Sequence, residues 1–168
     1  MLMLSKRILT VLVVLNWVCV ALFALVLAFI LSPVSAAIAD ELVRAYGPDR
    51  APSLMRAMAW VMGLGIMTSI AAHILFRRMR AIVRTAIDGD PFTIANARRL
   101  RTVGWALLAI QVIDLGFGLT SLALGARVGE PFGWNFSVGG WLAALMVFVL
   151  ARVFEQGSRM RDELAMTV

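Results

Sequence analysis

An uncharged apolar run near the start of the chain restricts its fold more than any other feature. The run extends for 24 residues, from Ile8 to Leu31, directly after Lys6 and Arg7. About 20 apolar residues in a helix are enough to cross the ~30 Å hydrocarbon core of a bilayer. Residues 37–39 (Ala-Ile-Ala) have the small-residue pattern of a signal-peptide cleavage site. The hydrophobic region of such a peptide is only about 7–15 residues long, so we predict a retained transmembrane helix instead.

Three further apolar segments follow the first. Hydrophobic residues make up 61% of the 168 residues and the mean hydropathy is +0.89, whereas soluble domains are about 45–50% apolar. A soluble protein of this size has too little interior to bury so much apolar surface. The sequence therefore predicts an all-α fold, an integral membrane four-helix bundle of one domain. Its spans are expected at residues 8–31, 57–76, 103–124 and 138–154.

The segments between the spans carry most polar residues and the helix-breaking sequences. From Ser35 to Tyr46 the apolar residues have helical spacing, which predicts a short amphipathic helix at the membrane surface. Asp88-Gly89-Asp90-Pro91 breaks the helix after the second span, and Thr93 is suited to cap the next helix. The expected connections are the outer loops 32–56 and 125–137, the cytoplasmic loop 77–102 and the cytoplasmic tail 155–168.

Lysine and arginine are distributed unequally between the two faces of this topology. Twelve lie in the N-terminal segment, the loop 77–102 and the tail with Arg152, whereas four lie on the opposite face. Cytoplasmic segments carry the excess of basic residues in membrane proteins, which is the positive-inside rule. We therefore predict that both the N- and C-termini are cytoplasmic. The formal charge of +6 and the pI of about 11.2 then reflect topology rather than direct binding of nucleic acid.

Asp114 is the most informative polar residue within the spans. Counted from Arg101 at about 1.5 Å per residue, it lies roughly 20 Å into a ~30 Å core, where a charged carboxylate costs several kcal/mol. It serves either as an ion, proton or ligand site, or as a protonated hydrogen-bonding group between helices. We predict an intramembrane polar site around it. The candidate residues are Asn16, Thr68, Ser69, His73, Gln111 and Asp114.

Basic residues surround the helix break in the cytoplasmic loop. They either fix the topology against lipid headgroups or form a docking surface for a soluble cytoplasmic protein. The candidate docking residues are Arg77, Arg78, Arg80, Arg84, Asp88, Gly89, Pro91, Phe92, Asn96, Arg98, Arg99 and Arg101. DNA itself is not an expected ligand, because the sequence offers no reading helix and the arginines lie close to the membrane.

Motifs that carry catalysis are missing from the sequence. It has no nucleophile elbow with Ser, His and Asp, no glycine-rich phosphate loop and no HExxH helix. Cys19 is its one cysteine and His73 its one histidine, which excludes an intramolecular disulfide and a Cys/His zinc site. We predict that the protein is not an enzyme and that it has no cofactor and no metal site.

Two stretches of the chain together resemble a known family. The first is Gly89-x-Pro91-Phe92-x-x-x-Asn96-x-x-x-Leu100, and the second is Leu150-Ala151-x-Val153-Phe154-x-x-Gly157, with Thr167-Val168 at the end. The pair is similar to a family of small bacterial four-span membrane proteins catalogued as a domain of unknown function. The resemblance implies a multi-pass protein of the bacterial inner (plasma) membrane. It also implies a partner, because members are often encoded beside a short regulator with a Cro/C1-type helix-turn-helix.

Together these features favour a membrane-embedded binding or regulatory protein that docks a small cytoplasmic transcriptional regulator. The alternative is a small permease or channel-like protein whose polar site is Asp114 with Gln111. The expected partners are the lipid bilayer and the helix-turn-helix regulator, and a homo-oligomer is compatible with the sequence.

Overall fold

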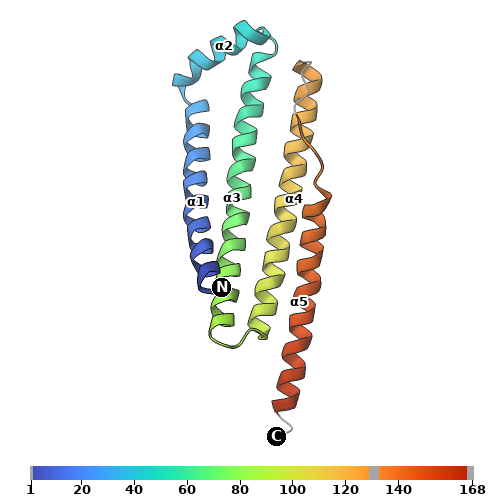
Figure 1. Ribbon diagram of the computed structural model, residues 1–168. Coiled ribbons are helices and arrows are strands. Elements are labelled where there is room, and N and C mark those ends of the chain that lie inside the picture. The colour runs from blue at the N-terminus through green and yellow to red at the C-terminus, as the bar shows by residue number, and fades with distance from the viewer. Residues whose placement is uncertain (1, 129–132, 166–168) are drawn as a thin grey trace. The chain divides into compact units, whose positions relative to one another are not determined.

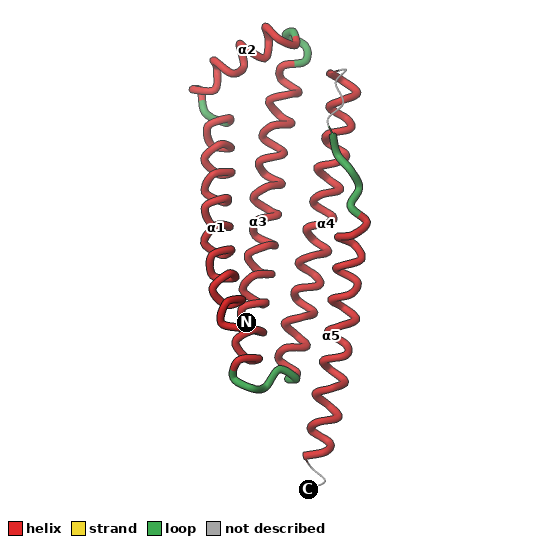
Figure 2. Tube along the Cα trace, viewed as in Figure 1, coloured by secondary structure: helices red, strands yellow, loops and turns green. Residues whose placement is uncertain are grey.

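The computed structural model describes residues 2–128 and 133–165, which form helices joined by short connections (Figure 1, Figure 2). Part of the expected outer loop 125–137 and the terminal Thr167-Val168 lie outside the described residues. The elements are α1 (Leu2–Ile30), the 3₁₀ helix η1 (Pro33–Ser35), α2 (Ala36–Tyr46), α3 (Ala51–Ile87), α4 (Ile94–Val128) and α5 (Val138–Ala165).

Four of these helices are long and apolar enough to cross a membrane. The candidate spans are Arg7–Ile30, Ala51–Ile87, Ile94–Arg127 and Val138–Arg161. The prediction of an all-α fold is therefore confirmed for the described residues, and four of the helices are candidate membrane spans, as predicted.

The helices are longer than the apolar segments from which they were predicted. α3 has 37 residues, so at about 1.5 Å per residue it is ~55 Å long, beyond the ~40–45 Å of a bilayer with its headgroups. The helix is therefore longer than a bilayer is thick. The predicted tail from residue 155 is likewise helical as far as Ala165.

The contacts within the chain define two compact units. The terminal unit consists of residues 1–16, 71–111 and 137–168, and the α2 unit consists of residues 17–70 and 112–136. α1, α3 and α4 each contribute a segment to both units, whereas α5 belongs to the terminal unit.

Local sequence explains where the helices begin and end. The Ser32 hydroxyl donates a hydrogen bond to the Phe29 carbonyl at 2.7 Å just after α1, and Pro33 opens η1, where no backbone N–H is required. α2 confirms the helix expected over 35–46, and it ends at Gly47. Gly47 has a φ of 84°, a conformation that glycine adopts without strain.

Small residues occupy most buried positions of the terminal unit. The buried residues of α4 and α5 there include Ala97, Leu100, Val103, Ala106, Ala144 and Ala151. Small side chains let helices approach closely, which matters in lipid because packing and hydrogen bonds, rather than exclusion from water, hold membrane helices together.

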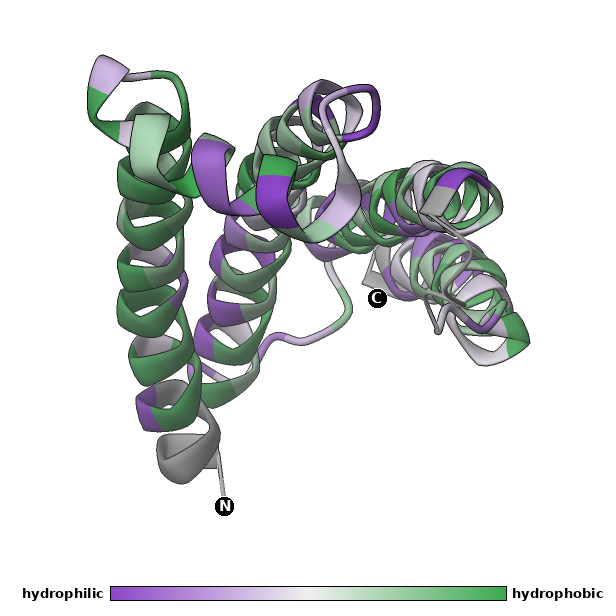
Figure 3. Ribbon diagram, turned by 90° about the horizontal axis from the view of Figure 1, so that it is seen from above, coloured by the Kyte–Doolittle hydropathy of each residue, from purple (hydrophilic) through white to green (hydrophobic). Residues whose placement is uncertain are grey.

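α1 shows the reverse of this pattern. Leu22 and Leu25 are 61% and 69% exposed, and most of the α1 surface is hydrophobic (green in Figure 3). Within the α2 unit, Phe23 of α1 packs against Gly65 of α3. A Cβ atom added to Gly65 would lie 3.0 Å from the Phe23 ring. A helix surface with so many exposed aliphatic side chains is suited to face lipid tails.

Candidate functional site

Asp114 has a tryptophan as its partner in the α2 unit. The indole nitrogen Nε1 of Trp134 donates a hydrogen bond to Oδ2 of Asp114 at 3.4 Å, a long and therefore weak bond. The indole lies directly against Gly118, one turn along α4, where an added Cβ would be 2.3 Å from the ring. The carboxyl group thus helps to hold the segment before α5 against α4, and Gly118 provides the space.

The other residues of the predicted polar site are divided between the two units. Gln111 belongs to the terminal unit, where its Nε2 donates to the Ser137 carbonyl at 3.4 Å. Asn16 is buried and His73 is half-buried in the same unit, whereas Thr68 and Ser69 belong to the α2 unit. The Ser69 hydroxyl donates to the Gly65 carbonyl of its own helix. A site shared by all six residues stays a prediction.

Asn96 holds the turn between α3 and α4. It is completely buried, with 0% of its surface exposed. Its Nδ2 donates to the Thr85 hydroxyl at 2.7 Å and to the Pro91 carbonyl at 2.8 Å, and its Oδ1 accepts from the Arg99 guanidinium at 2.8 Å. Its backbone N–H donates to Oγ1 of Thr93 at 3.2 Å, as expected for the predicted cap. Asn96 therefore shapes this surface without being exposed on it.

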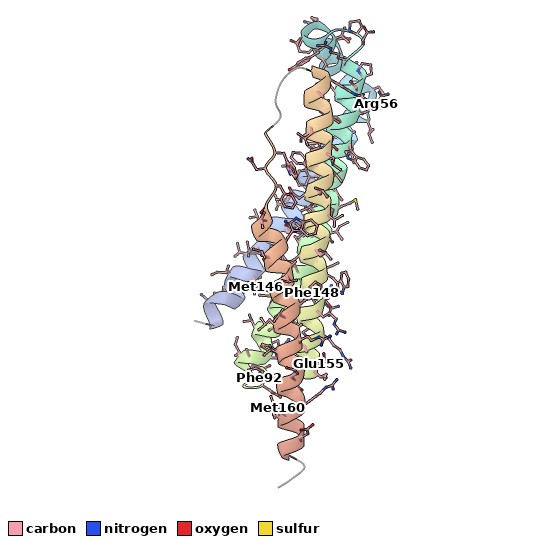
Figure 4. The ribbon with its side chains drawn as sticks, turned by 90° about the vertical axis from the view of Figure 1, so that its right-hand side faces the viewer. Arg56, Phe92, Met146, Phe148, Glu155 and Met160 are labelled. Carbon is pink, nitrogen blue, oxygen red and sulfur yellow. The ribbon has the colours of Figure 1, made fainter. Side chains whose placement is uncertain are left out.

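The two stretches of the family resemblance meet beside this turn. Phe92 packs on Phe154 with ring centroids 4.9 Å apart, and its ring lies over Gly157, where an added Cβ would be 3.5 Å away. Figure 4 shows Phe92 next to α5. Arg161 of α5 also forms an ion pair with Asp90 of the turn. The turn 88–93 and the polar half of α5 (residues 152–165) therefore form one continuous surface.

The candidate docking arginines separate into outward and inward groups. Arg77, Arg80 and Arg84 are exposed, and their i, i+3, i+7 spacing places them on one face of α3. Arg78 is exposed as well, and it lines a hollow of about 210 Å³ with His73 and Arg77. Arg99, in contrast, turns inward to Asn96 and to a carbonyl of α3.

Arg98 and Arg101 line a pocket between α4 and α5. The pocket has a volume of about 350 Å³, and α5 contributes Arg152, Glu155 and Arg159 to it. These three residues were not among the candidates predicted from the sequence. Their i, i+3, i+7 spacing could have indicated one polar face of α5, but not that this face meets Arg98 and Arg101.

The comparisons with known proteins agree with the resemblance found in the sequence. A family model described as "Protein of unknown function (DUF2975)" matches residues 35–168, so the match includes both resembling stretches and leaves out α1. Searches of curated proteins and of solved structures gave no match. The gene neighbour that the resemblance implies stays a prediction. Because the matched region covers most of its length, the chain belongs to the DUF2975 family of proteins of unknown function.

Proposed function

We propose that this chain is a membrane-embedded binding or regulatory protein that holds a small helix-turn-helix regulator at its cytoplasmic face. In this proposal the four helices anchor the protein in the bacterial inner membrane. The turn 88–93, the adjoining end of α3 and the polar half of α5 lie in the cytoplasm and form the docking face.

The contact between Phe92 and Phe154 carries this proposal. It joins the two stretches that resemble the family, which are about 60 residues apart in the sequence. Asn96 fixes the turn from inside with three side-chain hydrogen bonds to Thr85, Pro91 and Arg99. The two stretches are thus joined beside the turn between α3 and α4.

The charge of this face indicates the chemistry of the partner. Arg77, Arg80 and Arg84 form an exposed basic stripe on α3, and the positive-inside rule puts the same end in the cytoplasm. Complementary charge steers association and sets orientation. A regulator that docks here therefore presents an acidic surface, separate from its basic DNA-binding surface.

Co-purification tests the proposal directly. The tagged protein is expressed with the regulator encoded beside its gene, and binding is measured in detergent. We expect the double substitution Arg80→Gln/Arg84→Gln to weaken binding roughly 2- to 30-fold, because each exposed ion pair contributes about 0.2–1 kcal/mol. Arg44→Gln/Arg50→Gln removes the same charge outside this face and is the matched control. No regulator gene beside this one, or equal binding by both variants, would refute the proposal.

The permease alternative has less support. Trp134 donates a hydrogen bond to Asp114, and Gln111 donates one to the Ser137 carbonyl. Each of the two polar side chains therefore has a hydrogen-bonding partner within the fold. An enzyme is not proposed either, because the sequence has no catalytic motif.

A further inference from the structure

A pocket between α4 and α5 gathers positive charge apart from the basic stripe of α3. α4 contributes Arg98 and Arg101, one turn apart, and α5 contributes Arg152, Glu155 and Arg159. Glu155 pairs with Arg159 at 3.0 Å. Within the described part of the chain, no ion pair involves the other three arginines. Three like charges around one pocket favour an external anion.

The pocket lies where the polar and apolar parts of the helices meet. Phe148 forms its apolar side and packs edge-on against Trp105, with ring centroids 5.3 Å apart and an interplanar angle of 79°. A Cβ on Gly104 would be 2.9 Å from the Phe148 ring, so the ring has room to pack there because residue 104 is glycine. Trp105 is 60% exposed, one turn from Arg101. Exposed tryptophan is typical of the headgroup level of a membrane.

An apolar track continues from the pocket along α5. Val149 and Leu145 lie one and two turns from Arg152, and they are 58% and 62% exposed. Phe148 and Glu155 lie on the same side of α5, two turns apart (Figure 4). The flank therefore changes from guanidinium groups through aromatic rings to exposed aliphatic side chains. A phospholipid has the matching order, from its charged headgroup to its apolar acyl chains.

We infer that this pocket binds the phosphate group of an anionic phospholipid, whose acyl chains lie along the aliphatic flank of α5. Guanidinium groups bind phosphate oxygens in a bidentate manner, which suits these arginines to a phosphate group. Basic pockets between transmembrane helices on the cytoplasmic side are suited to anionic lipid headgroups. Free phosphate has the same headgroup chemistry, but it would leave the aliphatic flank unused. The inference does not depend on the cytoplasmic regulator.

Native mass spectrometry of the purified full chain in neutral detergent tests this site. Phosphatidylglycerol and phosphatidylcholine are added separately, and the bound lipid is counted. We expect phosphatidylglycerol to bind in preference, and Arg98→Gln/Arg152→Gln to weaken its binding roughly 30-fold, from the typical contribution of a basic residue beside anionic lipid. Arg80→Gln/Arg84→Gln removes the same charge from exposed positions of α3 and should leave binding within about twofold. Circular dichroism and gel filtration establish that each variant is folded.

Two further arms identify the ligand and the site. Glu155→Gln removes a carboxylate that lines the pocket and should strengthen phosphatidylglycerol binding, whereas weaker binding would contradict the inference. Excess inorganic phosphate should leave the lipid bound. Displacement of the lipid by phosphate would contradict the inference and identify the ligand as a free anion. Equal losses in both arginine double variants, or no preference for phosphatidylglycerol, would overturn the site.

Discussion

Asn96 offers a quantitative test of how the docking face is held. Asn96→Ala removes two neutral hydrogen bonds, worth about 1 kcal/mol each, and one bond to a guanidinium, worth about 1.5–3 kcal/mol. Arg99 keeps a second acceptor, the Ala81 carbonyl at 3.4 Å, and water can reach the loosened turn. We therefore expect the free energy of unfolding to fall by about 2–3 kcal/mol, less than the sum of the three bonds.

Unfolding of the purified protein in mixed dodecyl maltoside and SDS micelles, followed by tryptophan fluorescence, measures this change. Thr85→Val removes the hydroxyl that Asn96 contacts. The loss of unfolding free energy in the double variant Thr85→Val/Asn96→Ala should be about 1 kcal/mol smaller than the sum of the losses in the two single variants. Thr102→Ala is the control, because the Thr102 hydroxyl donates to the Arg98 carbonyl of its own helix, and it should cost under about 0.5 kcal/mol. A loss for Asn96→Ala as small as that of Thr102→Ala would refute the reasoning.

Three further predictions, the first with a matched control, concern contacts within each unit, and thermal unfolding in detergent measures each of them. Gly118→Ala places a methyl group 2.3 Å from the Trp134 ring and should lower the stability of the protein by about 1–3 kcal/mol. The control Gly116→Ala meets open space and should be neutral or slightly stabilising. Equal melting temperatures for the two variants would contradict the contact between Trp134 and Gly118. Asp114→Leu should lower stability by no more than about 1 kcal/mol, because it removes one long hydrogen bond; a collapse of expression would show a larger structural role. Gly89→Ala puts a side chain at a φ of 89° and should cost about 1–2 kcal/mol; an unchanged melting temperature would argue against this turn.

Local signals in the sequence predicted the helices and the turn well. The uncharged run before Ser32-Pro33 gave the end of α1, and the break at Asp88-Gly89-Asp90-Pro91 with Thr93 as cap matches the connection between α3 and α4. These features depend on a few neighbouring residues. Propensity, proline geometry and capping act over that range, so the sequence alone is enough to recognise them.

Contacts between helices could not be predicted in the same way. Arg98 and Arg99 are adjacent in the sequence, yet Arg98 lines a pocket with α5 and Arg99 turns inward to Asn96. The bond of Asp114 to Trp134 was also missed. In a membrane protein both the buried and the lipid-facing sides of a helix are apolar, so the hydrophobic pattern does not indicate which side meets a neighbour.

The orientation of the turn 88–93 decides whether the proposed docking face can meet a cytoplasmic partner. Single cysteines replace Asp88 in the turn and Asp49 between α2 and α3, in a Cys19→Ser background. Intact cells are then treated with a membrane-impermeant maleimide. The positive-inside rule predicts that Asp49→Cys is labelled in intact cells and that Asp88→Cys is labelled only after lysis. Labelling of Asp88→Cys in intact cells would place the arginine-rich face outside the cytoplasm and contradict the proposed function.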